Sequence, residues 1–415
     1  MYDCIIIGGG AAGLFAATLF EPKLKIALVN HHSTLGKKLS ITGKGRCNLT
    51  NACDRDTFFQ NIRKNPKFLY SAFSEFSNYD TMSYFEDAGV KLKVERGERV
   101  FPESDKAEDI VNALVRKVCA RKTDIIKASV SSVFFTSKGD NDGHFCVKTS
   151  KGELLAKNLI LATGGMSYPV TGSDGSGYAL AKSMGHTIID PTPSLVPVEV
   201  DEKQLCRSMC GLSLKNTALK LIRNGSIIYE DFGEMLFTPY GLTGPMILSM
   251  SPFAQKGDSI ILDLKPALDE KQLDRRLLSD FDKYINKNFS NALNDLLPSK
   301  MIEPFIKLTG IDPLTKVNSI TKEQRKIISD LLKGMTFTMD KHRPIAEAII
   351  TAGGVSVKEI NPKTMESKLV EGLYFAGEII DVDAYTGGFN LQVAFSTAYC
   401  AAKSISDKIL YYGDI

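Results

Sequence analysis

The amino-acid sequence predicts an α/β fold, and three observations carry that prediction. An apolar run, a glycine-rich turn and a second apolar run open the chain within its first thirty residues. From about residue 190 the pattern changes to alternating β-type segments that enclose a long helical stretch. The last seventy-five residues return to apolar runs that end in glycine. We therefore expect a Rossmann-like domain, split in the sequence, with an inserted β-rich domain that carries a helical subdomain.

The opening segment has the pattern of a dinucleotide-binding β-α-β unit. Residues 2–7 read as a buried parallel strand, 14–20 as an alanine-rich helix and 25–29 as the next strand. Between the first strand and the helix stands G-x-G-x-x-G, which consists of Gly8, Gly9, Gly10, Ala11, Ala12 and Gly13. In such units the three glycines permit a tight turn, a close approach of pyrophosphate to the backbone, and close packing of helix on strand. This context predicts a nucleotide whose phosphates lie at the helix N-terminus.

The end of the second strand departs from the usual pattern. This position normally carries Asp or Glu, which accepts hydrogen bonds from the ribose hydroxyls. Here it is Asn30, followed by His31 and His32. The amide oxygen of Asn30 can still accept a hydrogen bond, but without a charge the bond is weaker. We expect a weakened adenosine end of the nucleotide site.

Length and composition exclude several classes of protein. A chain of 415 residues predicts two to three domains, and a net charge of +3 with mixed signs gives no nucleic-acid footprint. No apolar run approaches eighteen residues, and the chain begins directly with a strand, so we expect a cytoplasmic protein without stable membrane insertion. The eight cysteines form no C-x-x-C pair and no zinc spacing, so no metal site is expected.

Residues 35–51 are rich in Gly, Lys, Arg, Ser, Thr and Asn and predict a loop around an anionic ligand. Gly43 and Gly45 next to Arg46 favour close contact with that ligand, although a solvated basic loop is the alternative. Cys47 and Cys53 have five residues between them, where flavin disulfide reductases have four. We therefore favour an unpaired Cys47 beside the cofactor over a redox dithiol.

The remainder of the first domain reads as helices and strands in turn. Helices are expected within 56–92 and at 105–121, and an antiparallel meander at 129–135, 144–149 and 153–156 with a Gly-Asp-Asn-Asp-Gly turn at 139–143. A second buried strand is expected at 158–165, where Thr163 and Gly164 suit a ligand in the crevice at a strand end. Residues 171–177 then open a helix that runs to Met184.

The middle of the chain predicts the inserted domain. Strands at 215–222 and 226–238 flank an Asn-Gly turn, and further strands are expected at 259–264 and 335–339. Residues 269–333 read as helical, with a capping box from Thr321 to Gln324. We expect the first domain to comprise 1–195 and 341–415, the β-rich domain 196–265 and 334–340, and the helical insertion 266–333.

The C-terminal segment predicts a second approach to the ligand. A strand at 371–378 runs into Gly377 and Glu378, and Gly387 and Gly388 precede a helix at about 391–410. Such a helix N-terminus suits an electron-rich acceptor, and the N1–C2=O edge of a flavin is the obvious candidate.

Taken together, these motifs resemble the two-dinucleotide-binding-domain flavoproteins. The resemblance extends to the bacterial FAD-dependent oxidoreductases related to aminoacetone oxidase and 3-dehydro-bile-acid Δ4,6-reductase. It rests on residues 8–13, 42–51, 99–102, 237–245, 351–355, 373–378 and 387–392 and covers nearly the whole chain.

The resemblance implies one non-covalent FAD. Pyrophosphate would lie at Gly8–Gly13, the flavin ring near Lys37, Lys38 and 43–48, adenine at the Val130 backbone, and the ribityl or phosphate near Asp381. The residues expected to bind the cofactor are Gly8, Gly10, Ala11, Ala12, Gly13, Asn30, His31, Lys37, Lys38, Thr42, Gly43, Gly45, Arg46, Cys47, Asn48, Val130, Thr163, Gly164, Gly377, Glu378, Asp381, Gly388, Asn390, Leu391 and Gln392.

The expected activity is hydride transfer through the flavin. No second glycine-rich β-α-β unit follows the first, so a separate NAD(P) domain is not expected. The resemblance to the bile-acid reductase implies that NADH or NADPH docks transiently as the reductant of a small, enone-like substrate. A flavin oxidase of a small amine such as aminoacetone with O₂, and a non-catalytic flavin-binding redox sensor, are the alternatives. A plain NAD-dependent dehydrogenase does not explain the C-terminal return. The candidate acid or base groups are Arg46, Tyr168, Asp383 and Tyr385.

Overall fold

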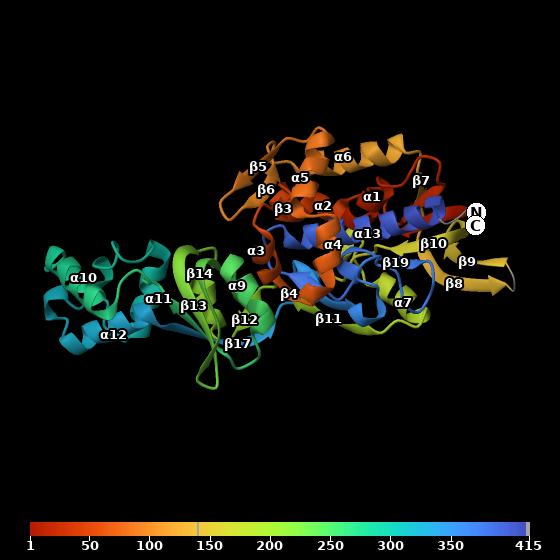
Figure 1. Cartoon of the computed structure of the whole chain (residues 1–415). Coiled ribbons are helices and arrows are strands. Elements are labelled where there is room, and N and C mark those ends of the chain that lie inside the picture. The colour runs from red at the N-terminus through yellow and green to blue at the C-terminus, as the bar shows by residue number, and fades with distance from the viewer. Residues whose placement is uncertain (139–140, 412–415) are drawn as a thin grey trace. The chain divides into compact units, whose positions relative to one another are not determined.

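A computed structural model describes residues 1–138 and 141–411, in two compact units (Figure 1). Unit 1 comprises Met1–Pro193 and Ala348–Ile415, and unit 2 comprises Ser194–Glu347. Part of the turn expected at 139–143, namely Gly139 and Asp140, lies outside the described residues.

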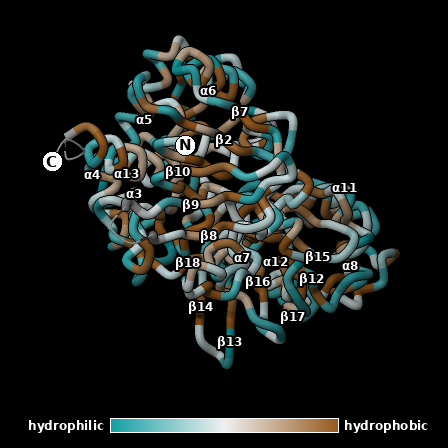
Figure 2. Tube along the Cα trace, turned by 90° about the vertical axis from the view of Figure 1, so that its right-hand side faces the viewer, coloured by the Kyte–Doolittle hydropathy of each residue, from teal (hydrophilic) through white to brown (hydrophobic). Residues whose placement is uncertain are grey.

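Unit 1 is built on a mixed seven-stranded sheet in the order β7-β2-β1-β10-β9-β8, with β19 also paired to β10. Its strands are β1 (Tyr2–Ile7), β2 (Ile26–Asn30), β7 (Asp124–Lys127), β8 (Val130–Lys138), β9 (Asn141–Thr149), β10 (Gly152–Leu161) and β19 (Leu373–Phe375). The pairs β7–β2, β2–β1, β1–β10 and β10–β19 are parallel, whereas β10–β9 and β9–β8 are antiparallel. Hydrophobic, brown trace marks the central strands of this sheet in Figure 2.

Strand β10 corrects the expectation of two separate strands at 153–156 and 158–165. It is one ten-residue strand that pairs differently along its length. Gly152 to Ala156 pair with β9, and Leu159 to Leu161 pair with β19. Its first four residues are exposed or half-buried, while its last four are buried throughout, as expected where a sheet is covered on both faces.

Helix α13 (Phe389–Tyr411) crosses the sheet next to α1 (Ala11–Ala17), as the blue and red ribbons show in Figure 1. Phe15 of α1 and Phe395 of α13 meet edge to face, with ring centroids 5.1 Å apart. The two ends of the chain therefore share one hydrophobic core.

The other helices of unit 1 are α2 (Lys37–Ile41), α3 (Arg55–Gln60), α4 (Tyr70–Glu75), α5 (Asn78–Asp87), α6 (Ala107–Ala120) and α7 (Ser176–Ser183). Its small sheets pair β3 (Thr50–Asn51), β6 (Arg99–Pro102) and β5 (Leu92–Glu95), then β4 (Ile62–Lys64) with β20 (Asp383–Ala384), and β11 (Ile188–Ser194) with β18 (Ile350–Val355). Helix α2 falls inside the segment expected to be a loop.

Unit 2 contains a closed six-stranded barrel in the order β12-β15-β14-β13-β16-β17. Its strands are β12 (Val198–Val200), β13 (Ser213–Arg223), β14 (Ser226–Phe237), β15 (Gly241–Thr243), β16 (Ser259–Asp263) and β17 (Met335–His342). The hairpin predicted from Asn224-Gly225 is confirmed, because both residues have positive φ (50° and 77°) between β13 and β14.

The helices of unit 2 are α8 (Lys203–Ser208), α9 (Pro245–Met250), α10 (Glu270–Lys283), α11 (Ser299–Thr309) and α12 (Lys322–Lys333). The predicted capping box from Thr321 to Gln324 is present at α12, and a second one joins Asp269 and Gln272 at α10. The mixed α/β architecture with a Rossmann-type sheet and an additional β-rich region confirms the predicted fold class. Within the described ranges, no helix is both long and apolar enough to span a membrane.

Candidate functional site

The carboxyl ends of four parallel strands meet at one edge of the unit 1 sheet. Three backbone hydrogen bonds join neighbouring strands at this edge. Gly8 N–H donates to Val29 O (2.9 Å), Ala162 N–H to Ile7 O (2.9 Å) and Ala376 N–H to Leu161 O (3.0 Å). The segments that leave β2, β1, β10 and β19 begin with Asn30, Gly8, Ala162 and Ala376. Ligands of open α/β sheets bind in the crevice outside such strand ends.

The glycine loop has the geometry that a pyrophosphate needs. A Cβ on Gly8, whose φ is +110°, would lie 2.4 Å from Ala162 O, and a Cβ on Gly13 would lie 1.9 Å from Gly8 O. These two glycines are therefore required by packing. A Cβ on Gly10 would meet no protein atom within 4 Å, so the backbone there is open to a ligand. The residues present thus fit the phosphates of a dinucleotide such as FAD.

Asn30 is already engaged by the chain itself. Its Oδ1 accepts a hydrogen bond from Gly9 N–H (3.1 Å), and its Nδ2 donates to the His32 carbonyl (2.8 Å). The oxygen keeps a second lone pair, so ribose binding by Asn30 stays a prediction. The exposed His31 ring lies beside the His32 ring, tilted by 40° with 4.1 Å between centroids, and both rings approach Gly172.

A polar network joins the strand ends. Lys38 Nζ donates to Glu378 Oε2 (2.7 Å) and to Ser167 Oγ (2.6 Å). Glu378 Oε1 accepts from Ser167 Oγ (3.0 Å) and from Thr351 N–H (2.8 Å). Glu378 and Gly164 are neighbours, since a Cβ on Gly164 would lie 4.0 Å from the Glu378 carboxylate. Three residues expected at the cofactor therefore lie together. They are Lys38 of α2, Gly164 after β10 and Glu378 after β19. Lys37 Nζ donates instead to the Val170 carbonyl (2.6 Å).

We use the name flavin-side loop for residues Thr42–Asn48. Four consecutive or near-consecutive residues in it have positive φ, namely Gly43 (57°), Lys44 (59°), Gly45 (82°) and Cys47 (59°). For the two non-glycine residues this conformation costs on the order of 1 kcal/mol each. Such local strain persists only where surrounding contacts over-determine the backbone.

The two cysteines of this region are not redox partners in the structure. Cys47 and Cys53 are both free, buried thiols. Burial raises the pKa of Cys47 to about 12 and that of Cys53 to about 11. Both thiols are therefore protonated and weakly nucleophilic at neutral pH.

Asn48 links the flavin-side loop to the start of α13. With its amide turned to satisfy both partners, its oxygen accepts from Gly388 N–H and its nitrogen donates to Thr50 O, both at 3.1 Å. A Cβ on Gly388 would lie 2.3 Å from Thr50 O, so only glycine permits this approach. Asn390 clamps the preceding turn, because its amide bonds both Ala384 N–H (3.0 Å) and Ala384 O (2.8 Å).

Gln392 is a correction to the expected flavin contacts. Its fully buried side chain accepts from Thr50 Oγ1 (2.7 Å) and Thr81 Oγ1 (2.8 Å). Its amide nitrogen donates to Phe76 O (3.2 Å) and Ser396 Oγ (3.0 Å). The amide points into the core, with both its oxygen and its nitrogen satisfied, so it holds α13 in place and has no free group for a ligand.

Two of the four candidate acid or base groups are held in ion pairs. Arg46 contacts the carboxylates of Glu95 and Asp105. Asp383, which is 1% exposed, pairs with Arg63 at 2.6 Å. Tyr168 and Tyr385 are half-buried, and Tyr168 has a left-handed backbone with φ of 52°.

The remaining predicted residues lie in unit 1 at separate places. Asp381 is buried, and its Oδ1 forms an ion pair with Lys64 Nζ (2.8 Å). Gly377 lies close to α1, since a Cβ there would lie 2.9 Å from Ala12 Cβ. Val130 begins β8 opposite Thr149, and Leu391 packs against the core.

Three buried hydroxyls lie near this edge, and two of them, on Ser173 and Tyr178, were missed by the sequence reasoning, whereas Thr163 was expected at the cofactor. Thr163 Oγ1, Ser173 Oγ and Tyr178 OH are buried without a hydrogen-bond partner among the described residues. Buried hydroxyls are normally satisfied by ordered water or by a ligand. The signal was present in the Gly- and Ser-rich segment 171–177, which was interpreted only as a helix start.

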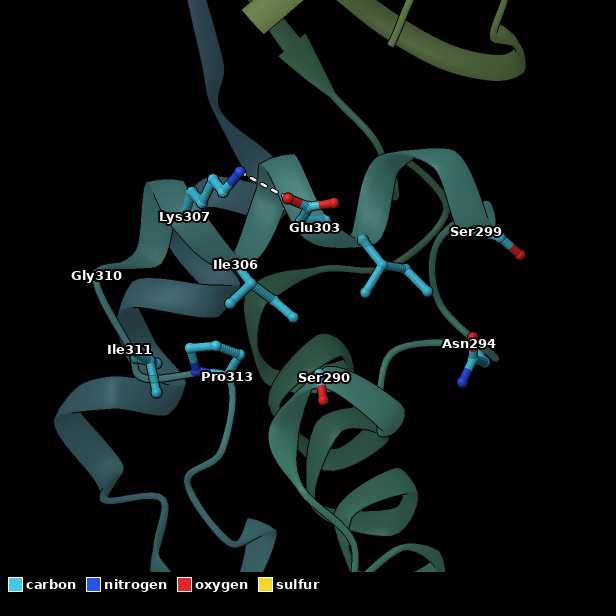
Figure 3. Close-up of a pocket in the computed structure, with 10 residues that line it drawn as sticks. Ser290, Asn294, Ser299, Glu303, Ile306, Lys307, Gly310, Ile311 and Pro313 are labelled. Carbon is cyan, nitrogen blue, oxygen red and sulfur yellow. Dashed lines mark hydrogen bonds and ion pairs between the residues drawn. The ribbon is translucent and has the colours of Figure 1, made fainter. Parts of the chain in front are cut away.

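A separate groove of about 450 Å³ lies in unit 2. Figure 3 shows Lys307 joined to Glu303 on α11, with Ile306 directed toward the side of Ser290 and Pro313. None of the expected cofactor residues lines this groove. In the part of the chain that the structure describes, no cluster of His, Cys, Asp or Glu is arranged to hold a metal ion.

Comparison with known proteins gives a family for the chain and several similar proteins. The chain matches the family described as HI0933-like protein Rossmann domain over residues 2–404. A 3-dehydro-bile acid delta(4,6)-reductase of Clostridium scindens is 30% identical over 414 residues, which cover 97% of this chain and 98% of the relative. A ribosomal RNA dihydrouridine synthase of Haemophilus influenzae is 33% identical over 404 residues, with the same coverage. A 3-ketosteroid delta1-dehydrogenase from Sterolibacterium denitrificans shares the fold, with a TM-score of 0.51 at 12% identity over 98% of this chain and 99% of that one.

The fold and the family match define a Rossmann-type, FAD-dependent oxidoreductase, which confirms the predicted class of enzyme. The chain belongs to the HI0933-like family, and the resemblance seen in its motifs is confirmed.

Proposed function

We propose that this protein reduces a carbon–carbon double bond conjugated to a carbonyl, with NADH or NADPH as the reductant. The carrying observation is that two relatives of at least 30% identity, matched over nearly their whole length, bear names that specify this chemistry. A 3-oxo steroid with 4,6 double bonds and the uracil ring share an alkene conjugated to a carbonyl. Reduction of either adds a hydride at a carbon remote from the carbonyl and a proton at a carbon nearer to it.

Bound FAD supplies the hydride chemistry. We propose that Gly8–Gly13 bind its pyrophosphate, because the open backbone at Gly10 leaves room there. The Lys38–Glu378 network and the flavin-side loop would orient the ring system. Gly388 would bring the first free N–H groups of α13 to the ring edge, where they favour negative charge. We also propose that unit 1 is the cofactor domain and that unit 2 is the inserted domain.

We propose that a tyrosine supplies the proton. Arg46 and Asp383 are held in ion pairs, so Tyr168 and Tyr385 remain as candidates from the predicted set. Tyr168 follows Ser167, which belongs to the Lys38–Glu378 network, and its backbone is strained. Strain of this kind is concentrated at functional sites. We therefore place Tyr168 first.

The substrate is the finer question. A small enone fits the modest net charge of +3 and the absence of a basic excess in the sequence. Uridine in ribosomal RNA is the second candidate, which the 33% identical relative favours. Both require the same reduction, so one experiment can compare them.

The test is an anaerobic absorbance titration of the FAD-loaded protein with NADH and NADPH, followed by an acceptor. Bleaching of the flavin bands by one nucleotide, and their return on addition of a 3-oxo-4,6-diene bile acid, supports the small-molecule form of the proposal. Return only with a uridine-containing ribosomal RNA fragment, with dihydrouridine formed, supports the RNA form.

Other outcomes would contradict the proposal. Reduction by neither nucleotide, but by a small amine with hydrogen peroxide formed in air, would instead identify an oxidase. Slow turnover with every donor and acceptor would favour a flavin-binding redox sensor. Tyr168→Phe and Tyr385→Phe variants, assayed at saturating acceptor, then compare the two proton donors, and the donor's variant should lose about 10²-fold or more in kcat.

A further inference from the structure

The flavin-side loop needs an external support. Lys44 and Cys47 both adopt a left-handed backbone, which is unfavourable for side chains with a Cβ. Within the loop, hydrogen bonds run from Cys47 N–H to Thr42 O (3.0 Å) and from Arg46 N–H to Gly43 O (3.3 Å). These two short-range bonds close the turn but attach it to nothing else.

The side chain of Arg46 supplies an attachment to the β5–β6 region. Its Nε donates to Asp105 Oδ1 (2.7 Å), and its Nη2 contacts the carboxylates of both Asp105 (2.6 Å) and Glu95. The guanidinium also lies over the Phe101 ring, with Cζ 4.2 Å from the ring centroid. A planar guanidinium can make these ionic and stacking contacts together, which an ammonium group cannot.

The two carboxylates are shared with a second cation. Lys93 Nζ donates to Asp105 Oδ2 (2.7 Å) and lies 3.6 Å from Glu95 Oε1. Two cations and two anions thus form a locally neutral cluster at the base of the loop. Arg46 is 34% exposed and Asp105 is 42% exposed, so solvent screens the cluster and its contribution to global stability is small.

The position of Arg46 makes its contacts local in effect. It lies between Gly45 and Cys47, both with positive φ, and two residues before Asn48, whose amide oxygen accepts from Gly388 N–H at α13. The Arg46 side chain therefore attaches the strained turn to β5 and β6, while the Asn48 side chain attaches it to the N-terminus of α13. Release of the first tie would free the turn without breaking the core.

We propose that Arg46 is a positioning residue that presents the flavin-side loop to the flavin through the Glu95, Asp105 and Phe101 contacts. The proposal rests on the proposed FAD site. It assigns Arg46 an indirect role through its neighbours' backbone, in place of the acid or base role considered from the sequence.

The test compares Arg46→Ala, Arg46→Lys and a matched control in FAD-binding titrations. Lys403→Ala is the control, because Lys403 forms an exposed ion pair with Asp407 (3.0 Å) on α13 within the same unit. We expect the FAD dissociation constant to rise about tenfold in Arg46→Ala, and the flavin absorption bands and midpoint potential to shift. Arg46→Lys should recover part of the affinity, because it keeps the charge and loses the fork and the stacking. Lys403→Ala should leave all three quantities at their wild-type values.

Asp105→Asn and the double variant Arg46→Ala/Asp105→Asn complete a double-mutant cycle that tests whether Arg46 acts through Asp105. Asp105→Asn leaves Arg46 in place and removes one anion, and its effect on FAD affinity should not add to that of Arg46→Ala. Additive effects, or an Arg46→Ala variant with wild-type affinity, spectrum and potential, would overturn the proposal. If wild-type protein binds no FAD, the proposed function fails first, and that outcome is distinguishable because it needs no variant.

Discussion

Two glycine-containing loops of unit 1, both proposed to bind FAD, have their backbone conformations fixed by different kinds of contact. The glycine loop at Gly8–Gly13 is shaped by backbone packing, because a Cβ on Gly13 would overlap Gly8 O at 1.9 Å. The flavin-side loop at Thr42–Asn48 is shaped by side-chain ties from Arg46 and Asn48 to other elements. The first loop carries its own shape in its sequence, whereas the second takes its shape from residues far along the chain. The two loops should therefore respond differently to substitution.

The largest effect is expected from Gly13→Val in the glycine loop. The added side chain would force α1 away from β1, in a region where both elements belong to one buried core. Overpacking against backbone should lower the free energy of unfolding by about 3 kcal/mol or more, and much of the protein should become insoluble. Urea unfolding followed by circular dichroism measures the loss. A soluble variant of wild-type stability would show that α1 does not pack on β1 as described.

Gln392→Leu tests the tie on the far side of the flavin-side loop. The change leaves the buried hydroxyl of Thr50 without its acceptor, and Thr81 keeps only its longer hydrogen bond to Ser77 O (3.2 Å). Unsatisfied buried groups predict a loss of about 2–3 kcal/mol in the free energy of unfolding. The measurement is urea unfolding of the FAD-free protein, so that cofactor binding does not contribute. If stability is unchanged and only FAD affinity falls, the original assignment of Gln392 to the flavin edge is restored.

Gly10→Ala separates ligand contact from packing within the glycine loop. A Cβ here meets no protein atom, and the Gly10 backbone has an ordinary φ of −83°. The thermal midpoint of the FAD-free protein should therefore stay within a degree or two of wild type. FAD affinity should fall about tenfold, because the methyl group occupies space intended for pyrophosphate. A drop in the thermal midpoint without a change in FAD affinity would contradict both parts.

The smallest expected effect is a pH dependence of the free energy of unfolding that is caused by His186, a residue outside both loops. Ser367 Oγ accepts from Leu369 N–H and Val370 N–H, both at 2.9 Å, so its hydrogen is free to donate to His186 Nε2. The proton of neutral His186 then lies on Nδ1, 3.3 Å from Glu359 Oε2. Burial lowers the pKa of His186 below its ordinary value of 6.5.

The unfolded chain therefore binds the His186 proton more readily than the folded one. Stability is complete above about pH 6.5 and falls as the pH drops through that value toward the lower folded pKa. Between pH 7.5 and 5.5 wild type should lose on the order of 1 kcal/mol more than His186→Gln, measured by urea unfolding at each pH. Equal losses in the two proteins would assign the acid sensitivity to other groups.

The features predicted from the sequence are those whose causes lie close together in the chain. Gly8–Gly13, the Asn224-Gly225 turn and the Thr321–Gln324 capping box each depend on a few neighbouring residues, and the turn and the capping box are confirmed. The boundary of α1 was placed three residues too late, because Ala11–Gly13 read equally as turn and helix.

The features that escaped prediction depend on partners far along the chain. The single strand β10 could not be read, because its continuity past Lys157 depends on β1 alongside it. Gln392 was assigned to a ligand because three of its four partners, Thr50, Thr81 and Phe76, lie outside its own helix. The carboxylates that bind Arg46 belong to Glu95 and Asp105, about fifty to sixty residues further along the chain, and no local sequence pattern in the loop predicts them.

The pairing of β10 with β19 has a consequence for the order in which the chain can fold during synthesis. Leu161 of β10 pairs with Phe375 of β19, whereas unit 2 is one continuous segment between them. As the chain leaves the ribosome, the barrel of unit 2 can close as soon as Glu347 has emerged. At that point Leu159 to Leu161 of β10 still have no strand partner on the side that β19 later occupies, because β19 and α13 are synthesised last. Unit 2 can thus fold before unit 1 is complete. In the interval before β19 is synthesised, the open strand edge is most exposed to pairing with another chain.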